Sequence, residues 1–431
     1  MAKNKEKKQQ KQKTDTAPSC GFSDVLPRDS AVWKEMWRAG NSVAELHGCH
    51  AIETPALESV SIFEKIFGKD RRAAEKSWYV FKLPGSREKF ALRPTGLFPL
   101  VRSYIQHHLG YFASPLKVFF RGSAFSREDD FGICPSGEFR ELGFSILGDN
   151  DPVYDIETVQ SAFSFLKAVK IRKSVLKINT NGCRACKAGY RDKLRSFCAK
   201  ERPNMCKKCA KAQNPYLFLS CGDEKCATLR QEAPLILNHL CQNCNNHFKT
   251  ILELLEEEGI VYELDPNLVR DGDAWNRFVF SVHSQQGTLL ALGGRFDYVS
   301  EALFGRQVPA VGNVIFLDRV ADCMKASASG ERKEKPKVFF VAIGDHAKKA
   351  SVRLINLLRE GGVIAVEALG KKSLKMQLKT AERMKVPFAL LLGQKEAFEG
   401  TVIIRDTRTG AQETVVADRM VEVVKKKLKE E

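Results

Sequence analysis

No stretch of this 431-residue chain approaches the roughly 18 uninterrupted apolar residues that a membrane-spanning helix requires. The first sixteen residues also lack an apolar core and a small-residue cleavage site, so nothing in them resembles a secretion signal. Acidic residues are outnumbered by basic ones, 52 to 69, which leaves a formal net charge of +17. We therefore expect a cytoplasmic protein without membrane contact, whose basic balance suits an RNA partner.

The composition also excludes a wholly disordered chain, because 43% of the residues are hydrophobic and 9% are aromatic. The length suggests two to four domains, at about 100–200 residues per domain. The exception is the N-terminus, where residues 1–16 contain six Lys, one Glu and one Asp. We expect residues 1–20 to form a disordered basic arm, which either attracts RNA phosphates or only aids solubility.

Thirteen cysteines need an explanation in a reducing compartment, where stable disulfides are rare and clustered cysteines more often bind metal. Five are scattered singly and are interpreted as small hydrophobic residues: Cys20, Cys49, Cys134, Cys198 and Cys323. The other eight form four close pairs: Cys183 with Cys186, Cys206 with Cys209, Cys221 with Cys226, and Cys241 with Cys244.

Eight thiolates in four pairs predict two structural zinc sites, since tetrahedral zinc takes four such ligands. The spacing does not decide which pair joins which, and redox-active or free thiols remain the alternative. No histidine completes the ligand set, which argues against an open catalytic metal. Residues 183–244 contain twelve Lys and Arg against five Asp and Glu, so the segment would keep a charge of +3 with two zinc ions and eight thiolates.

Before residue 325, local patterns predict a mixture of helices and strands. Helical patterns cover residues 30–47, 155–168, 247–258 and 317–324, and strand patterns cover residues 78–83, 117–120, 278–282 and 288–292. Residues 325–337 are small, polar and charged, which is typical of a linker. After it, strand patterns at 338–343, 363–369, 388–393 and 401–406 alternate with helical ones, which predicts a compact α/β domain.

Several segments resemble, in order, histidyl-tRNA synthetases, a family of class II aminoacyl-tRNA synthetases. They are GFSDVLPRDSAVW with IETPALES, FALRPTGLFPLVR, VFFRGSAFSRED with GEFRELGFSILG, LDPNLVRDGDAWNRFVF, ALGGRFDYV and VPAVGNVIFLDRV. The C-terminal segment from Ser373 to Asp406 resembles the anticodon-binding domain of that family. The resemblance extends from Gly21 to about Val424, which is nearly the whole chain.

The resemblance implies an α+β class II synthetase core with a mostly antiparallel sheet and flanking helices, a cysteine-rich zinc insertion, and a C-terminal α/β anticodon-binding domain. It also implies a homodimer that uses ATP with magnesium, an amino acid (histidine) and tRNA. The expected divisions are the arm (1–20), the two parts of the catalytic core (21–180 and 247–324), the insertion (181–246), the linker (325–337) and the anticodon-binding domain (338–431).

Three arginines match positions that the family places on the ATP phosphates. Arg270 in LVRDGD matches the arginine over the reacting phosphate, and Arg319 in FLDRV matches the arginine of motif 3. Arg127 in SRED matches the arginine of motif 2, although a shift of one position would place Ser126 there and leave Glu128 as the neighbouring acid. A guanidinium presents five donors in a planar fork, which suits a phosphate.

The amino-acid pocket departs from the family pattern. Where the family has RPEGT this chain has RPTGL, so that Thr95 replaces the glutamate that holds the substrate ammonium. Glu141 replaces a glutamine and Ser145 a glutamate, while Asp273 is kept and Trp275 replaces a tyrosine. Each unmade contact costs on the order of 1–3 kcal/mol. Either Glu141 takes over the ammonium, or the pocket has lost its amino-acid ligand.

Basic residues at near-helical spacing in the C-terminal domain suit contacts with tRNA phosphates: Lys371, Lys372, Lys375, Lys379 and Arg383. Such a stripe is also common on a solvated helix face. Three functions therefore fit the sequence. They are a histidyl-tRNA synthetase-like enzyme, a non-aminoacylating paralogue that binds tRNA or regulates a partner enzyme, and a related enzyme that activates another acid.

Overall fold

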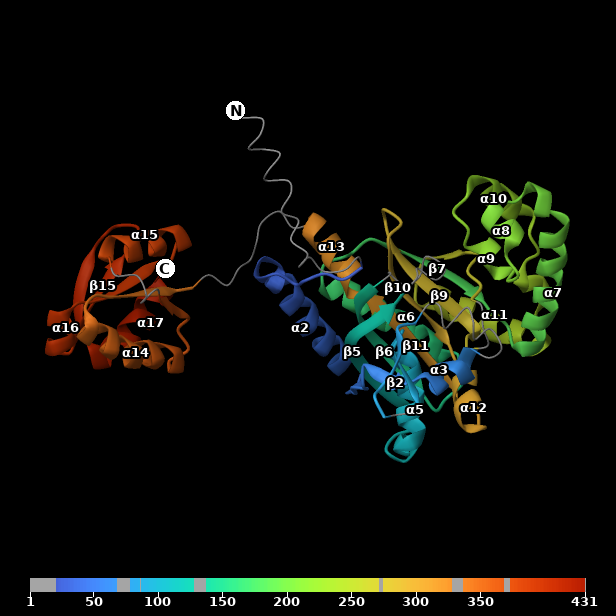
Figure 1. Cartoon of the computed structure of the whole chain (residues 1–431), viewed down its shortest axis with the longest axis horizontal. Coiled ribbons are helices and arrows are strands. Elements are labelled where there is room, and N and C mark those ends of the chain that lie inside the picture. Colours follow the sequence, from blue (N-terminus) through green and yellow to red (C-terminus); the bar gives the residue numbers. More distant parts are fainter. Residues whose placement is uncertain are drawn as a thin grey trace. The chain divides into compact units, whose positions relative to one another are not determined.

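The computed structural model describes residues 21–67, 78–85, 87–127, 137–270, 274–327, 336–367 and 373–430. The chain forms two compact units, Met1–Ser329 and Gly330–Glu431, each described here by itself (Figure 1). Among the described helices, none combines the length and the apolar character needed to cross a membrane. The predicted basic arm at residues 1–20 lies outside the described residues.

The first unit is built on an eight-stranded sheet in the order β1-β5-β6-β11-β10-β9-β7-β8. The pairs β1/β5 and β7/β8 are parallel and the other neighbours are antiparallel, so the sheet is mixed and mostly antiparallel. Its strands are β1 (His50–Ala51), β5 (Leu116–Ser126), β6 (Gly137–Leu147), β7 (Ser174–Thr180), β8 (Tyr262–Leu264), β9 (Asn276–Ser284), β10 (Leu289–Arg295) and β11 (Ala310–Phe316).

Alternating side chains give this sheet two buried faces. Along β6, Leu142 and Phe144 join the core that includes residues of α2 (Ser30–Leu46), α6 (Val153–Ala168), α11 (Gln242–Glu257) and α13 (Leu317–Ser327). Phe139 and Leu147 point the other way, into the core that includes residues of α5 (Leu97–Gln106) and α12 (Tyr298–Phe304). The odd-numbered residues of β6, Glu141 and Ser145 among them, therefore face the α5 side.

A small three-stranded sheet in the order β2-β4-β3 adjoins this second face. Its strands are β2 (Leu57–Ser59), β3 (Val80–Lys82) and β4 (Lys89–Leu92), followed along the chain by α5. Helix α3 (Val60–Phe67) packs on it through Phe63, whose ring lies 5.3 Å from that of Trp78. This arrangement brings the segment 93–97 to the edge of the large sheet, where Phe125 N–H bonds the Arg93 carbonyl at 3.0 Å.

The cysteine-rich segment is inserted between β7 and β8 and has a small core of its own, which includes Tyr190, Leu194 and Phe218. It contains α7 (Arg184–Lys200), α8 (Lys207–Lys211), α9 (Tyr216–Leu219) and α10 (Glu224–Leu229) (Figure 1). Helix α11 begins at Gln242 inside this segment and continues into the core of the large sheet. Its first turn is polar, so the apolar period at residues 247–258 predicted the helix but not its start.

The C-terminal unit is an α/β sandwich on a five-stranded sheet in the order β13-β12-β14-β15-β16. Its strands are β12 (Val338–Ala342), β13 (Ala365–Glu367), β14 (Phe388–Leu392), β15 (Thr401–Asp406) and β16 (Gln412–Val416). Its helices are α14 (Asp345–Glu360), α15 (Leu374–Met384), α16 (Gln394–Glu399) and α17 (Met420–Glu430). Sequence periodicity predicted all of these except α16, which has six residues, and β16, an edge strand in which only Val415 is buried.

Candidate functional site

The floor of the central site is a buried carboxyl group on β6. Glu141 has no exposed surface, and it accepts hydrogen bonds from Gly96 N–H at 2.5 Å and from Thr95 Oγ1 at 3.2 Å. Burial raises the pKa of Glu141 to about 7, against the lowering effects of Arg93 and of these two donors. Gly96 is needed for this approach, since a Cβ there would lie 2.6 Å from the Phe120 ring and 3.1 Å from Glu141 Oε1.

Arg270 follows β8 and is 7% exposed. Its guanidinium carbon lies 5.1 Å from the centre of the Trp275 ring, and its Nη2 donates to the Phe280 carbonyl at 3.4 Å. The Trp275 ring in turn contacts the ring of Phe98, with 6.3 Å between the centroids. Because Phe98 lies two residues after Gly96, these ring contacts connect Arg270 with the segment that bonds Glu141.

Arg319 reaches the same side of the sheet from α13. Its guanidinium carbon lies 4.8 Å from the centre of the Phe316 ring, and its Nη1 donates to the Leu289 carbonyl at 3.2 Å. Phe316 is the β11 partner of Glu141 in the strand register. The Phe316 ring thus supports Arg319 beside the strand that carries the carboxyl group.

The contacts described above do not involve the other residues predicted from the sequence. Ser145 is fully buried four residues beyond Glu141 on β6, and its hydroxyl has no hydrogen-bond partner among the described residues. Arg127 is exposed directly after the last residue of β5. Glu128, Asp273, Lys371 and Lys372 lie outside the described residues. The exposed residues Lys375, Lys379 and Arg383 follow one another at four-residue spacing on α15.

The eight paired cysteines form two groups of four, in each of which the sulfur atoms lie within 4.8 Å of one another. The outer cluster consists of Cys183, Cys186, Cys241 and Cys244, and the inner cluster consists of Cys206, Cys209, Cys221 and Cys226. Along the chain, the first cysteine pair therefore groups with the fourth, and the second groups with the third. The sequence spacing did not decide between this nested arrangement and a sequential or interleaved one. Sulfur to sulfur distances include 3.5 Å between Cys183 and Cys186, and 3.7 Å between Cys206 and Cys221.

Each cluster has a thiol with a lowered pKa at the start of a helix. Cys206 is the N-cap of α8, and a hydrogen bond from the backbone of Cys209 is the main cause that lowers its pKa to about 7. Cys241 is the N-cap of α11, where the backbone of Cys244 has the same effect. Backbone donors at a helix start stabilise thiolates, which are the form that binds metal.

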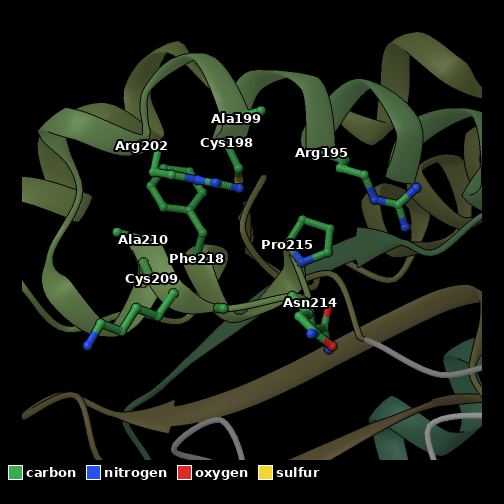
Figure 2. A pocket seen from close by; sticks show the side chains of 12 residues that line it. Arg195, Cys198, Ala199, Arg202, Cys209, Ala210, Asn214, Pro215 and Phe218 are labelled. Atoms are coloured by element: carbon green, nitrogen blue, oxygen red, sulfur yellow. The ribbon is translucent and has the colours of Figure 1, made fainter.

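A pocket of about 480 Å³ opens on the cysteine-rich segment (Figure 2). Its lining combines the basic side chains of Arg195, Arg202 and Lys211 with the ring of Phe218, and it includes no acidic residue from the described part of the chain. Arg195 also pairs with Asp192 at 3.3 Å. The sequence showed that this segment is positively charged, but it did not show that three of its basic side chains line the same pocket.

Sequence reasoning also missed Asn181, which is fully buried at the end of β7. Its carboxamide bonds both backbone groups of Arg270, with Oδ1 accepting from the N–H at 2.9 Å and Nδ2 donating to the carbonyl at 2.8 Å. Only its position two residues before Cys183 could have drawn attention to it.

Known protein families match both units of this chain. The model described as "Histidyl-tRNA synthetase" matches residues 21–320, and the model described as "Anticodon binding domain" matches residues 337–427. The histidine--tRNA ligase of Halothermothrix orenii is 30% identical over 416 residues, which cover 94% of this chain and 98% of that protein. The histidine--tRNA ligase of Natranaerobius thermophilus is 30% identical over 399 residues, covering 91% and 94%.

A solved structure agrees with these relatives. The apo histidyl-tRNA synthetase of S. aureus superposes with a TM-score of 0.74 at 25% sequence identity, covering 95% of this chain and 99% of that one. The matches thus extend over both units and over the segment that joins them.

Proposed function

The chain belongs to the histidyl-tRNA synthetase family, and we propose that it joins histidine to tRNA at the expense of ATP. The observation that carries this proposal is a chain of contacts on one face of a class II sheet. Arg270 lies against the ring of Trp275, which contacts Phe98. Gly96, two residues before Phe98, bonds the Glu141 carboxyl group. Relatives that match over both units are histidine--tRNA ligases, which does not favour a regulatory paralogue.

Activation requires attack of the histidine carboxylate on the α-phosphate of ATP. Arg270 and Arg319 would neutralise the phosphate charge that develops in this step, and Arg127 would contact the remaining phosphates from the end of β5. Magnesium enters with ATP as part of the substrate. Arg270 and Arg319 each lie against an aromatic ring and donate to a backbone carbonyl. Because these contacts already hold the two side chains, little reorganisation is needed when the nucleotide binds.

Recognition of the histidine ammonium would fall to Glu141. Thr95 replaces the glutamate that the family uses, but its hydroxyl bonds the Glu141 carboxyl group and so adds to the same polar surface. A carboxyl group with a pKa of about 7 can ionise when an ammonium approaches. The unpartnered hydroxyl of Ser145 and the face of Trp275 complete the proposed amino-acid pocket, with Asp273 between Arg270 and Trp275 in the sequence.

Both cysteine clusters fit zinc. Four ligands at a zinc to sulfur distance of about 2.3 Å place tetrahedral sulfur atoms about 3.8 Å apart. The described distances of 3.5, 3.7 and 4.0 Å bracket that value. We infer one structural zinc ion in each cluster, held by thiolates only. Both ions would stabilise the inserted segment and would take no part in the reaction.

tRNA would contact the chain at both units. Lys375, Lys379 and Arg383 form an exposed basic row on α15 of the unit that matches the anticodon-binding model. The basic pocket of the cysteine-rich segment would contact a second part of the same RNA. We also propose a cytoplasmic location, in which these thiols would stay reduced.

We also propose a homodimer, which would cover exposed apolar side chains on the first unit. Tyr111 is 93% exposed and Phe112 68%, and the Phe112 ring lies 5.1 Å from that of His50 beside the edge strand β1. Leu46, at the end of α2, is 81% exposed. Large apolar side chains left on a surface mark an interaction site, and a second copy of this chain would cover them.

The experiment that tests the function is ATP–pyrophosphate exchange on zinc-replete protein, with histidine and with each of the other standard amino acids. We expect exchange with histidine alone. Arg270→Ala should reduce kcat by about 100- to 1000-fold, as expected for a lost donor to transition-state charge. Arg184→Ala, which removes an exposed arginine from α7, should leave exchange unchanged. Exchange with another amino acid, or with none, would contradict the assignment.

A further inference from the structure

The backbone of Arg270 is bonded by two residues of the cysteine-rich segment, Asn181 and Lys187. Asn181 bonds the N–H and the carbonyl of Arg270, as described above, and its Nδ2 also donates to the Trp275 carbonyl at 3.2 Å. One carboxamide thus bridges both ends of the stretch 270–275. A carboxamide has one acceptor and one two-hydrogen donor group, so both kinds of group are in use.

Lys187 adds a second bond to the same carbonyl. It lies on α7 and is only 8% exposed, and its ammonium donates to the Arg270 carbonyl at 2.6 Å. The ammonium also lies 5.7 Å from the centre of the Tyr216 ring. A buried lysine is costly unless its charge meets an acceptor, so this placement indicates a specific contact and not a solubilising charge.

Both residues are tied to the outer cysteine cluster. Gly182 and Cys183 separate Asn181 from α7, and Lys187 directly follows Cys186. Gly182 has φ +61° and a Cβ there would lie 2.6 Å from the Cys186 Cβ, so the tight turn into the cluster requires glycine. Its carbonyl accepts from Arg277 N–H at 2.8 Å, which pairs this turn with the far side of the Arg270 stretch.

We propose that Asn181 and Lys187 are positioning residues for Arg270, and that the outer cysteine cluster holds them in place. The inserted segment is then part of the activation machinery as well as a surface for RNA. The proposal rests on the proposed function for the role of Arg270, but the contacts that it names exist independently of the substrate. Neither side chain touches a reacting atom, so their effect on catalysis is indirect.

The test compares Asn181→Ala and Lys187→Met with Asn245→Ala and Lys193→Met, which remove the same residue types from exposed positions on α11 and α7. Exchange kinetics with histidine give kcat and the KM values for histidine and ATP. We expect kcat to fall about tenfold or more, because a displacement of about 1 Å at a reacting group can cost 100-fold. Both KM values should stay within about threefold of the unmodified protein. Lys187→Arg, which keeps a donor, should recover part of kcat.

Hydrogen exchange followed by mass spectrometry provides a readout that does not depend on activity. The Arg270 amide bonds Asn181 directly, so the peptide covering residues 268–277 should exchange faster in Asn181→Ala and in Lys187→Met than in the two controls. If Asn181→Ala loses zinc or melts early, Lys187→Met carries the comparison. Unchanged kcat, or unchanged exchange of this peptide in a folded variant, would overturn the proposal.

These readouts separate the two proposals. Absence of histidine-dependent exchange in the unmodified protein would contradict the assigned reaction, while the hydrogen-exchange comparison would still decide whether Asn181 and Lys187 hold the Arg270 backbone. Normal activity in the unmodified protein together with normal kcat in both variants would contradict the positioning role alone.

Discussion

Arg295 and Asp155 form an ion pair that is closed to solvent on both sides. Nη2 of Arg295 lies 2.6 Å from Asp155 Oδ2, Nε also contacts both carboxylate oxygens, and each side chain has 0% exposed surface. His247 approaches the same carboxylate at 3.5 Å. This contact joins the end of β10 with α6 and with α11, the helix that begins in the cysteine-rich segment.

Breaking this pair should destabilise the first unit strongly. Asp155→Asn leaves the Arg295 charge buried with a weaker partner, and the loss of one member of a buried pair costs about 3–5 kcal/mol. Urea unfolding of the zinc-replete protein measures this loss. Arg184→Ala, which breaks the exposed pair with Glu301, should change the free energy of unfolding by less than about 1 kcal/mol. Equal effects of the two variants would contradict the prediction.

Glu141 should make stability depend on pH in the acidic range. Its pKa rises from 4.5 to about 7 on folding, chiefly through burial. As the pH rises from 4.5 to 7, the unfolded chain releases this proton first, so the free energy of unfolding falls by about 3 kcal/mol across the window. Glu141→Gln removes this titrating group. The difference in free energy of unfolding between the unmodified protein and the variant should therefore change between pH 4.5 and pH 7. Parallel curves would show that the carboxyl group ionises normally.

The same carboxyl group should govern the affinity for histidine. Glu141→Gln keeps an acceptor for Gly96 N–H but loses the charge that we propose faces the ammonium, a contact worth about 1.5–3 kcal/mol. We expect the KM for histidine to rise by about 10- to 100-fold, and the KM for ATP to stay unchanged. Glu138→Gln, on the same strand, serves as the control. A similar KM for histidine in Glu141→Gln and in the unmodified protein would remove Glu141 from the pocket.

Each cysteine cluster should hold one zinc ion, and the two should have different effects. Elemental analysis of protein purified without chelator should find two zinc ions per chain, and one in Cys183→Ser or in Cys206→Ser. Only the loss of the outer cluster should speed hydrogen exchange in residues 268–277, since Asn181 and Lys187 flank that cluster. Well under two zinc ions in the unmodified protein would contradict the assignment.

The affinity for tRNA should depend less steeply on salt concentration when basic side chains are removed from the pocket. Arg195→Ala with Arg202→Ala removes two cations from its lining, and each lost phosphate contact should reduce the slope of log affinity against log salt by about 0.7–0.9. Lys193→Ala with Lys200→Ala makes the same change in charge on α7 outside the pocket. Equal slopes for the two double variants would show that the pocket gives only general attraction.

The local pattern was sufficient to predict most of the C-terminal unit, but in the first unit it left out the strands β6, β7 and β11 and the helices α5, α7 and α12. A 3.6-residue period predicted α6 and α14, and short apolar runs predicted β12 and β14, because these segments are long or apolar enough for the pattern to show. The pattern did not predict α16, because six residues are too few for a helical period to show. It did not predict β16 either, because only one side chain of that strand is buried. The start of α11 was missed because its first turn is set by Cys241 and not by apolar spacing.

The sequence by itself determined the kind of chemistry: four cysteine pairs, three arginines in family positions, and a glutamate where the family has glutamine. Only the tertiary structure decided that the first pair joins the fourth, because the intervening 54 residues from 187 to 240 fold back on themselves. It also decided that Asn181, at the end of β7, bonds Arg270, 89 positions later in the chain. Such contacts depend on how strands pair across the sheet, and no local spacing records that pairing.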